Sequence, residues 1–161
     1  MQKKALSGIV IASAAIYIFL LYYMLFRLAG REMVILSEHM LYNYNYWNAV
    51  NLVPFKTITE YIAAVVDGSL RAHAIRNLFG NLLLFFPMGF YLPFFLEKMR
   101  KIKTYSMVMA AAIIVIEIVQ LATKSGSLDI DDFILNLAGA LIGFIVFTRT
   151  PIRKLLKLRA W

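Results

Sequence analysis

The chain has 161 residues, 61% of them apolar, with 17 lysines and arginines, 9 aspartates and glutamates and no cysteine. This apolar excess argues against a disordered chain and against a soluble nucleic-acid-binding module, although the net charge is +8. The lack of cysteine excludes a disulfide scaffold, thiol catalysis and a cysteine-ligated zinc site. The composition therefore indicates an integral membrane protein.

Four stretches are long and apolar enough to cross a bilayer, for which a helix needs about 20 residues. We expect an all-α membrane protein with spans at residues 5–28, 77–96, 104–123 and 130–149, all in one domain over residues 1–150. The first stretch is about twice the usual length of a signal-peptide apolar region and lacks a cleavage site, so we expect it to remain as a span.

The one long loop, residues 29–75, follows the first span. Residues 41–47 mix aromatic and amide side chains, a composition that suits an anchor at the headgroup level. A sugar-stacking surface is the alternative reading of the same residues.

After the last span, residues 151–161 alternate basic and apolar side chains and predict a surface helix on anionic lipid. Nucleic-acid binding is the alternative there, and we expect none.

A short amphipathic helix is expected within the long loop. Pro54 predicts a bend or an extended piece just before it. Residues 57–66 place apolar side chains at spacings of three and four, which gives one helical face. Thr57 is the predicted cap at the start, and Asp67-Gly68 the predicted end. This helix should lie in the membrane interface or pack over the bundle.

Charge sets the expected orientation, because basic residues near spans collect on the cytoplasmic side. With both termini inside, the cytoplasmic segments hold one acid, Glu97, and an excess of basic residues: Lys3, Lys4, Lys98, Arg100, Lys101, Lys103, Arg149, Arg153, Lys154, Lys157 and Arg159. The outer segments are nearly balanced. The basic excess therefore predicts an N-in/C-in topology and the long loop outside.

Polar side chains in the outer halves of three spans form same-face pairs, at spacings of three or four: Asn77 with Asn81, Glu117 with Gln120, and Asp132 with Asn136. Because unsatisfied polar groups are costly in hydrocarbon, these faces should enclose a polar pocket, with Arg71, His73 and Arg76 just above. The predicted ligand-binding residues are Asn51, Arg71, Arg76, Asn77, Asn81, Glu117, Gln120, Asp129, Asp132 and Asn136.

Plainer roles for the same residues remain open. The amides and carboxylates can join helices by hydrogen bonds, and the acids are oxygen ligands suited to Mg²⁺ or Ca²⁺. Asp129 can cap the last helix, with Asp131 as an acid of its first turn. Glu117 can be protonated, or paired with Arg76 or Lys124.

Two features predict the shape of the spans. Gly139 and Gly143 allow another helix to approach the last span closely. Pro87, Gly89 and Pro93 predict a kinked inner half of the second span.

Four motifs in order resemble the VanZ-like family: Asn51-Leu-Val-Pro-Phe55, Asn77-x-x-Gly-Asn81-x-x-Leu-Phe-x-Pro87-x-Gly89, Glu117-Ile-Val-Gln120, and Asp129-Ile-Asp-Asp132-x-x-x-Asn136-x-x-Gly139-x-x-x-Gly143. Many members have an arginine where this chain reads Ser125-Gly126-Ser127, so the role of that arginine is vacant here or is covered by Lys124. The resemblance implies a bacterial cytoplasmic-membrane protein in a family whose founding member is linked to resistance to teicoplanin, a lipid-tailed glycopeptide.

Three functions follow as hypotheses. The first is a non-enzymatic protein whose outer-leaflet pocket binds a lipoglycopeptide or a cell-wall lipid intermediate, which contributes to resistance. The second is an intramembrane enzyme acting on a lipid headgroup or cell-wall precursor, with Glu117 as general acid or base. The third is a structural subunit that uses its Gly-x-x-x-Gly face between proteins. Membrane lipid is an expected partner in each case. The sequence assigns no catalytic residue, metal or cofactor, and no oligomeric state.

Overall fold

The computed structural model describes residues 2–28, 50–69 and 71–149, with side chains from residue 7 onward except at Leu28. The described part is almost wholly helical. Four helices are long and apolar enough to cross a membrane, at Ser7–Arg27, Arg71–Phe95, Ile102–Ala122 and Ile130–Arg149. The predicted fold class is therefore confirmed. The aromatic residues 41–47 and the tail 151–161 lie outside the described residues.

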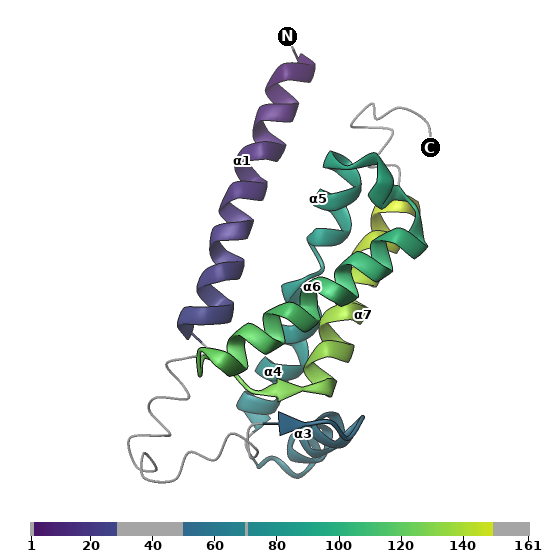
Figure 1. The fold of residues 1–161 in the computed structure, drawn as a ribbon. Coiled ribbons are helices and arrows are strands. Elements are labelled where there is room, and N and C mark those ends of the chain that lie inside the picture. The colour runs from purple at the N-terminus through teal and green to yellow at the C-terminus, as the bar shows by residue number, and fades with distance from the viewer. Residues whose placement is uncertain (1, 29–49, 70, 150–161) are drawn as a thin grey trace.

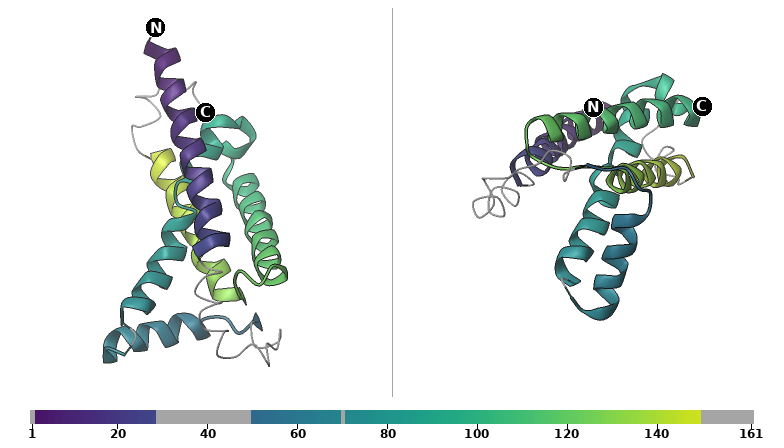
Figure 2. Two further views of the ribbon diagram at one scale, coloured as in Figure 1. Left: turned by 90° about the vertical axis from the view of Figure 1, so that its left-hand side faces the viewer. Right: turned by 60° about the horizontal axis from the view of Figure 1, so that its bottom comes forward.

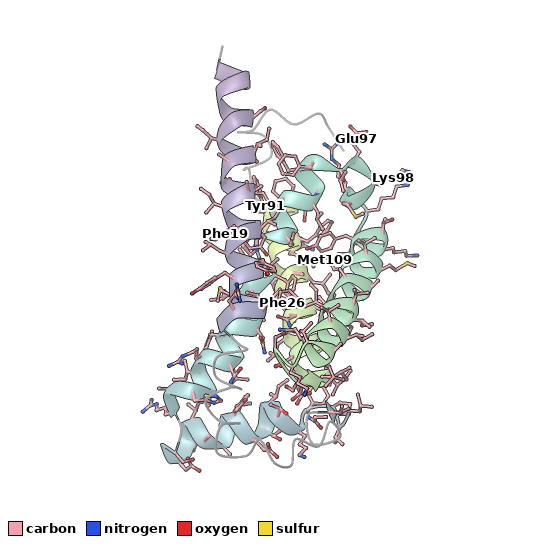
Figure 3. The ribbon with its side chains drawn as sticks, turned by 60° about the vertical axis from the view of Figure 1, so that its left-hand side comes forward. Phe19, Phe26, Tyr91, Glu97, Lys98 and Met109 are labelled. Carbon is pink, nitrogen blue, oxygen red and sulfur yellow. The ribbon has the colours of Figure 1, made fainter. Side chains whose placement is uncertain are left out.

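The start of the first helix and the end of the last lie at one end of the bundle, and the long-loop elements lie at the other (Figure 1). Figure 3 shows Glu97 and Lys98 at the α5–α6 turn, far from α3. This arrangement is what an even number of crossings requires. The side of the membrane that each end faces remains a prediction.

The first span consists of α1 (Gln2–Tyr23) and a wide π-helical turn, η1 (Met24–Leu28). Most of its side chains are exposed apolar residues, such as Phe19, which points away from the bundle in Figure 3. Two hydrogen bonds tie this span to the others: Tyr17 Oη donates to Leu84 O at 2.7 Å, and Gln120 Nε2 donates to Leu25 O at 2.9 Å. An exposed apolar surface is what a helix in lipid presents.

The predicted amphipathic helix is α3 (Lys56–Asp67), which runs crosswise to the spans at the end of the bundle (Figure 2). It packs against α4. Gly68 ends it with φ of 82°, as predicted, since glycine takes the left-handed conformation readily. The predicted Thr57 cap is wrong. The residue before the helix is Phe55, itself left-handed at φ of 66°, and its side chain makes no cap.

The second span is divided into α4 (Arg71–Leu84) and α5 (Met88–Phe95), which confirms the predicted kink. Pro87 has no N–H for the carbonyl of Leu83, so the α-helical ladder stops. The Leu84 carbonyl at this break accepts the Tyr17 hydroxyl instead. The helix begins six positions before the predicted residue 77, so the basic residues placed above the span lie in its first turns. A short 3-10 turn, η3 (Glu97–Arg100), follows α5.

The third and fourth spans are α6 (Ile102–Ala122) and α7 (Ile130–Arg149). Lys124 ends α6 in the left-handed conformation, and Ser125 N–H returns to the Gln120 carbonyl at 2.9 Å. The strand β2 (Leu128–Asp129) then pairs in parallel with β1 (Val50–Asn51). This two-residue bridge joins the long loop to the start of α7.

Backbone contacts between α4, α5 and α7 are very close. A Cβ added at Gly139 would lie 1.8 Å from Leu82 O, and one at Gly143 would lie 2.0 Å from Phe86 O. A Cβ at Gly89 would meet the α7 backbone at Phe144 N, 2.1 Å away. The predicted close approach is thus confirmed. The Gly-x-x-x-Gly face is covered by this chain's own second span, which removes the feature on which the hypothesis of a structural subunit rested.

Candidate functional site

A cavity of about 260 Å³ lies between the spans at the end of the bundle where α3 lies. Residues of α3, α4, α6, β2 and α7 line it, together with the end of the first span and the α6–β2 turn. Most of its lining residues carry a polar side chain. The lining residues are Leu25, Thr57, Tyr61, His73, Asn77, Asn81, Glu117, Gln120, Gly126, Ser127, Asp129, Asp132 and Asn136.

Asp129 closes one side of the cavity and is held there by three donors. Asn51 Nδ2 donates to its Oδ1 at 3.1 Å, and Thr57 Oγ1 donates to its Oδ2 at 2.7 Å. The backbone N–H of Asp131 donates to Oδ1 at 2.9 Å, so Asp129 also caps α7 as the sequence suggested. Asn51 Nδ2 lies 2.9 Å from Thr57 Oγ1 as well. The β-bridge and the first turn of α3 thereby fix this carboxylate.

Asp131 does not line the cavity but holds the element that covers it. Its carboxylate accepts the backbone N–H of Phe55 at 2.6 Å and that of Ile58 at 3.0 Å. Unpaired N–H groups at a helix start are normally capped by a nearby side chain of the same helix. Here a fully buried aspartate of α7 caps α3. The reading of Asp131 as merely a first-turn acid of α7 misses this second role.

Two amides of α4 face the cavity and bond to different walls. Asn81 Nδ2 donates to Asp132 Oδ1, which links α4 to α7. Asn77 Nδ2 donates to the Tyr61 hydroxyl at 3.1 Å, which links α4 to α3, and lies 3.4 Å from His73 Nε2. The spacing of four that predicted a shared face is correct.

The deepest polar groups of the cavity carry unused acceptors. Glu117 and Asn136 are 6% and 3% exposed. Within the described chain, Glu117 Oε2 and Asn136 Oδ1 are buried and have no hydrogen-bond partner. Such acceptors are rare in folded proteins and call for an explanation, which a bound ligand can provide.

Of the ten predicted residues, seven line the cavity: Asn77, Asn81, Glu117, Gln120, Asp129, Asp132 and Asn136. Asn51 does not line the cavity, but it donates a hydrogen bond to Asp129, which does. Arg71 and Arg76 are not part of the lining, and neither is Lys124, which the sequence offered as a substitute for the family arginine. Whether the seven bind a ligand remains a prediction.

The sequence did not place the residues that α3 contributes. Thr57 and Tyr61 were assigned to a cap and to an apolar interfacial face, yet both line the cavity. His73 was expected above the pocket and lies in its wall. Their common signal was weak: Thr57, Tyr61 and His73 are polar-ended side chains on neighbouring elements, but nothing local showed that α3 folds back onto α4.

Three carboxylates line this cavity: Glu117, Asp129 and Asp132. Among the described lining residues, His73 is the one basic side chain. The described residues contain no group of three or more His, Asp and Glu side chains arranged to hold a metal ion. The predicted magnesium or calcium reading therefore gains no support from the geometry.

A second, apolar groove of about 440 Å³ lies between α1 and α4. Its lining is Tyr17, Leu20, Leu21, Met24, Ile75, Arg76, Phe79, Gly80, Leu83 and Leu84. Consecutive residues divide between the two spaces: Met24 and Gly80 line the groove, while Leu25 and Asn81 line the cavity. The polar and apolar spaces are thus neighbours along both helices.

Fold and site together define a multi-pass α-helical membrane protein with a polar cavity set into one end of its bundle. The chain belongs to the VanZ/LLP1 family, whose model matches residues 14–154. The match includes all four spans, the first from its middle onward, and every residue that lines the cavity. No curated protein and no solved structure matches the chain.

Proposed function

We propose that this protein binds an amphiphilic or lipid-linked molecule of the bacterial cell envelope, and thereby contributes to resistance to lipid-tailed glycopeptides of the teicoplanin type. The observation that carries the proposal is the polar cavity at the end of an otherwise apolar bundle. Its buried acceptors on Glu117 and Asn136 have no partner within the described chain. The family membership supports the link to resistance.

The neighbouring groove explains why the ligand should be amphiphilic. A polar part placed among Asn81, Glu117 and Asp132 lies one residue along α4 from the apolar wall formed by Phe79 and Gly80. The membrane supplies an apolar chain to the groove without any cost of exposing it to water. A ligand with only one of the two parts would leave one space to lipid or to water.

The protein is proposed to lie in the bacterial cytoplasmic membrane. The end of the bundle that holds the start of α1 and the end of α7 is on the cytoplasmic side in this proposal. Lys98, Arg100, Lys101 and Lys103 then face the cytoplasm at the α5–α6 turn. The cavity faces the outer leaflet, where lipid-linked cell-wall precursors and the antibiotics that target them are found. An accessibility assay with cysteines introduced at Lys98 and at Glu60 tests this orientation.

Resistance assays with cavity variants test the function. We expect Glu117→Gln and Asp132→Ala to abolish the resistance that the wild-type protein confers in a susceptible host. Glu97→Gln, in an exposed carboxylate at the other end of the bundle, should keep it. Membrane levels of each variant are measured by immunoblotting. Wild-type resistance in well-expressed Glu117→Gln and Asp132→Ala would contradict the proposal.

Direct binding provides the second arm of the test. Purified protein in detergent should bind a teicoplanin-type glycopeptide and should bind a tail-free glycopeptide at least ten-fold more weakly. Asp132→Ala should lose the tight binding. If the wild-type protein binds neither compound more tightly than Asp132→Ala does, the glycopeptide is not the ligand of the cavity. A cell-wall lipid intermediate is then tested in the same format.

A specific observation also favours a second function, an intramembrane enzyme. Glu117 and Asp132 line one cavity with His73, and paired carboxylates with different partners can serve as general acid and base. Mass spectrometry of lipid precursors incubated with the purified protein, with and without Mg²⁺, tests it. Turnover that Glu117→Gln removes would favour the enzyme.

A further inference from the structure

The charge and hydrogen-bonding capacity of the cavity restrict the headgroup that it can take. Glu117, Asp129 and Asp132 supply carboxylates, while Arg71 and Arg76 lie outside the lining. A phosphate or carboxylate brought among these groups would meet three acidic side chains, and in the described lining it would find one basic partner, His73. An anionic headgroup is therefore disfavoured.

The unused hydrogen-bonding atoms are acceptors. Glu117 Oε2 and Asn136 Oδ1 are both buried and, in the described chain, unpartnered. Asp129 accepts from Asn51, Thr57 and the Asp131 N–H, and Asp132 accepts from Asn81. A ligand that completes this cavity must bring donors to Glu117 and Asn136.

We propose that the cavity receives a protonated primary amine carried on an apolar chain, whose ammonium group donates to Glu117 Oε2 and Asn136 Oδ1. An ammonium has three donors and no acceptor, and its charge is opposite to that of the surrounding carboxylates. A sugar hydroxyl offers a donor without the charge. A quaternary ammonium offers the charge without a donor.

The inference rests on the proposed amphiphile binding and names the chemistry of the polar end. The groove beside the cavity gives the position of the apolar end. Phe79 lines the groove, two residues from Asn81 in the cavity wall. The chain of the amine should therefore lie against Phe79, between α1 and α4.

Calorimetric titration of the full-length protein in dodecyl maltoside micelles tests the headgroup. The probes are dodecylamine, dodecyltrimethylammonium and dodecanol, which share one chain. We expect dodecylamine to bind at least ten-fold more tightly than the other two. Glu117→Gln and Asn136→Leu should each lose that preference, while Glu97→Gln should keep it. The difference between wild type and Glu117→Gln corrects for partition of each probe into micelles.

Two further probes test whether the headgroup alone, or a divalent cation, accounts for the binding. Ethylamine carries the headgroup alone and should bind at least ten-fold more weakly than dodecylamine, with a difference that Phe79→Ala reduces. Magnesium chloride tests a divalent cation at the carboxylates. Binding of Mg²⁺ without binding of dodecylamine would overturn the inference, and so would equal affinity for ethylamine and dodecylamine.

The outcome also separates this inference from the proposed function. If all three dodecyl probes bind equally and Glu117→Gln changes nothing, the amine inference fails. Loss of glycopeptide binding in Asp132→Ala would still support the proposed function in that case. If the wild-type protein binds none of the dodecyl probes, the glycopeptide and the cell-wall lipid intermediate more tightly than the variants do, both fail. Should Glu117→Gln not fold, Asn136→Leu carries the same comparison.

Discussion

The carboxylate of Asp131 at the start of α7 accepts the backbone N–H of Phe55 at 2.6 Å, across 76 positions of sequence. The same carboxylate accepts the Ile58 N–H at 3.0 Å. One fully buried side chain thus caps the N-terminus of a helix to which it does not belong. Because α3 carries Thr57 and Tyr61 into the cavity wall, this cap determines the shape of the candidate site.

Asp131→Ala should release α3 from the bundle. Two hydrogen bonds to a charged group are lost together with the helix cap, for which we expect a stability loss of about 2 kcal/mol. Hydrogen exchange should become faster at the backbone amides of α3 before it changes in α6. Glu60→Ala, an exposed change on the same helix, is the control. Unchanged exchange in α3 of Asp131→Ala would show that the cap does not hold this helix.

Gly139→Ala and Gly143→Ala should each force α4 and α5 away from α7. The added Cβ would lie at 1.8 Å or 2.0 Å from a backbone carbonyl oxygen that cannot rotate away. Overpacking of this kind costs about 1–3 kcal/mol or more, so thermal unfolding in detergent should begin at a clearly lower temperature. Gly80→Ala is the matched change, with no atom within 4 Å of the new Cβ. It should leave stability unchanged or raise it by up to about 1 kcal/mol.

Lys124→Gly should stabilise the protein, and Lys124→Val should destabilise it. Lys124 ends α6 at φ of 54°, where a side chain with a Cβ is strained by about 1 kcal/mol. Glycine removes that strain, and a β-branched valine increases it. The two melting temperatures, measured side by side by circular dichroism, should lie on opposite sides of the wild-type value. A lower value for Lys124→Gly would show that the lysine side chain contributes more than its backbone conformation costs.

Tyr17→Phe and Gln120→Leu should loosen the first span without unfolding the other three. Each removes one side-chain hydrogen bond to a backbone carbonyl, at 2.7 Å and 2.9 Å. Bonds between helices in membranes contribute about 0.6 kcal/mol on average, so the double variant should be needed for a large effect. Distances between spin labels on α1 and α6 should broaden in the double variant. Tyr22→Phe, an exposed tyrosine of the same helix, should leave them unchanged.

The four spans were predictable because length and hydropathy alone decide whether a helix can cross a bilayer. Close packing at Gly139 and Gly143, the break before Pro87 and the Gly68 end of α3 were also predictable, since each depends on the local chemistry of one residue. The residue at which a helix begins is harder to predict. Hydropathy marks the apolar part of α4 from Asn77, but the helix extends back to Arg71 through charged residues that its backbone tolerates.

Because α4 begins at Arg71, both Arg71 and Arg76 lie within the helix and not above the pocket, where they were expected. Consecutive residues of a helix are about 100° apart around its axis, so Arg76 and Asn77 face different spaces although they are neighbours in sequence. Arg76 lines the groove and Asn77 the cavity. The position of α3 could be predicted only as two alternatives, because its amphipathic pattern suits both a lipid surface and a bundle end. The contacts to Asp129 and Asp131 attach α3 to the bundle end, and its depth in the membrane interface stays a prediction.

The two-residue bridge between β1 and β2 has a consequence for biosynthesis. Asn51 and Asp129 meet across 78 positions, so the segment that contains β1 and α3 leaves the ribosome long before its partners. Contacts of such sequence separation form late, because the intervening chain must first be ordered. The first three spans must therefore be in the membrane before the cavity acquires its outer wall. A nascent chain that stops ahead of residue 128 carries Glu117 and Gln120 but still lacks the part of the cavity wall that Asp129, Asp132 and Asn136 form.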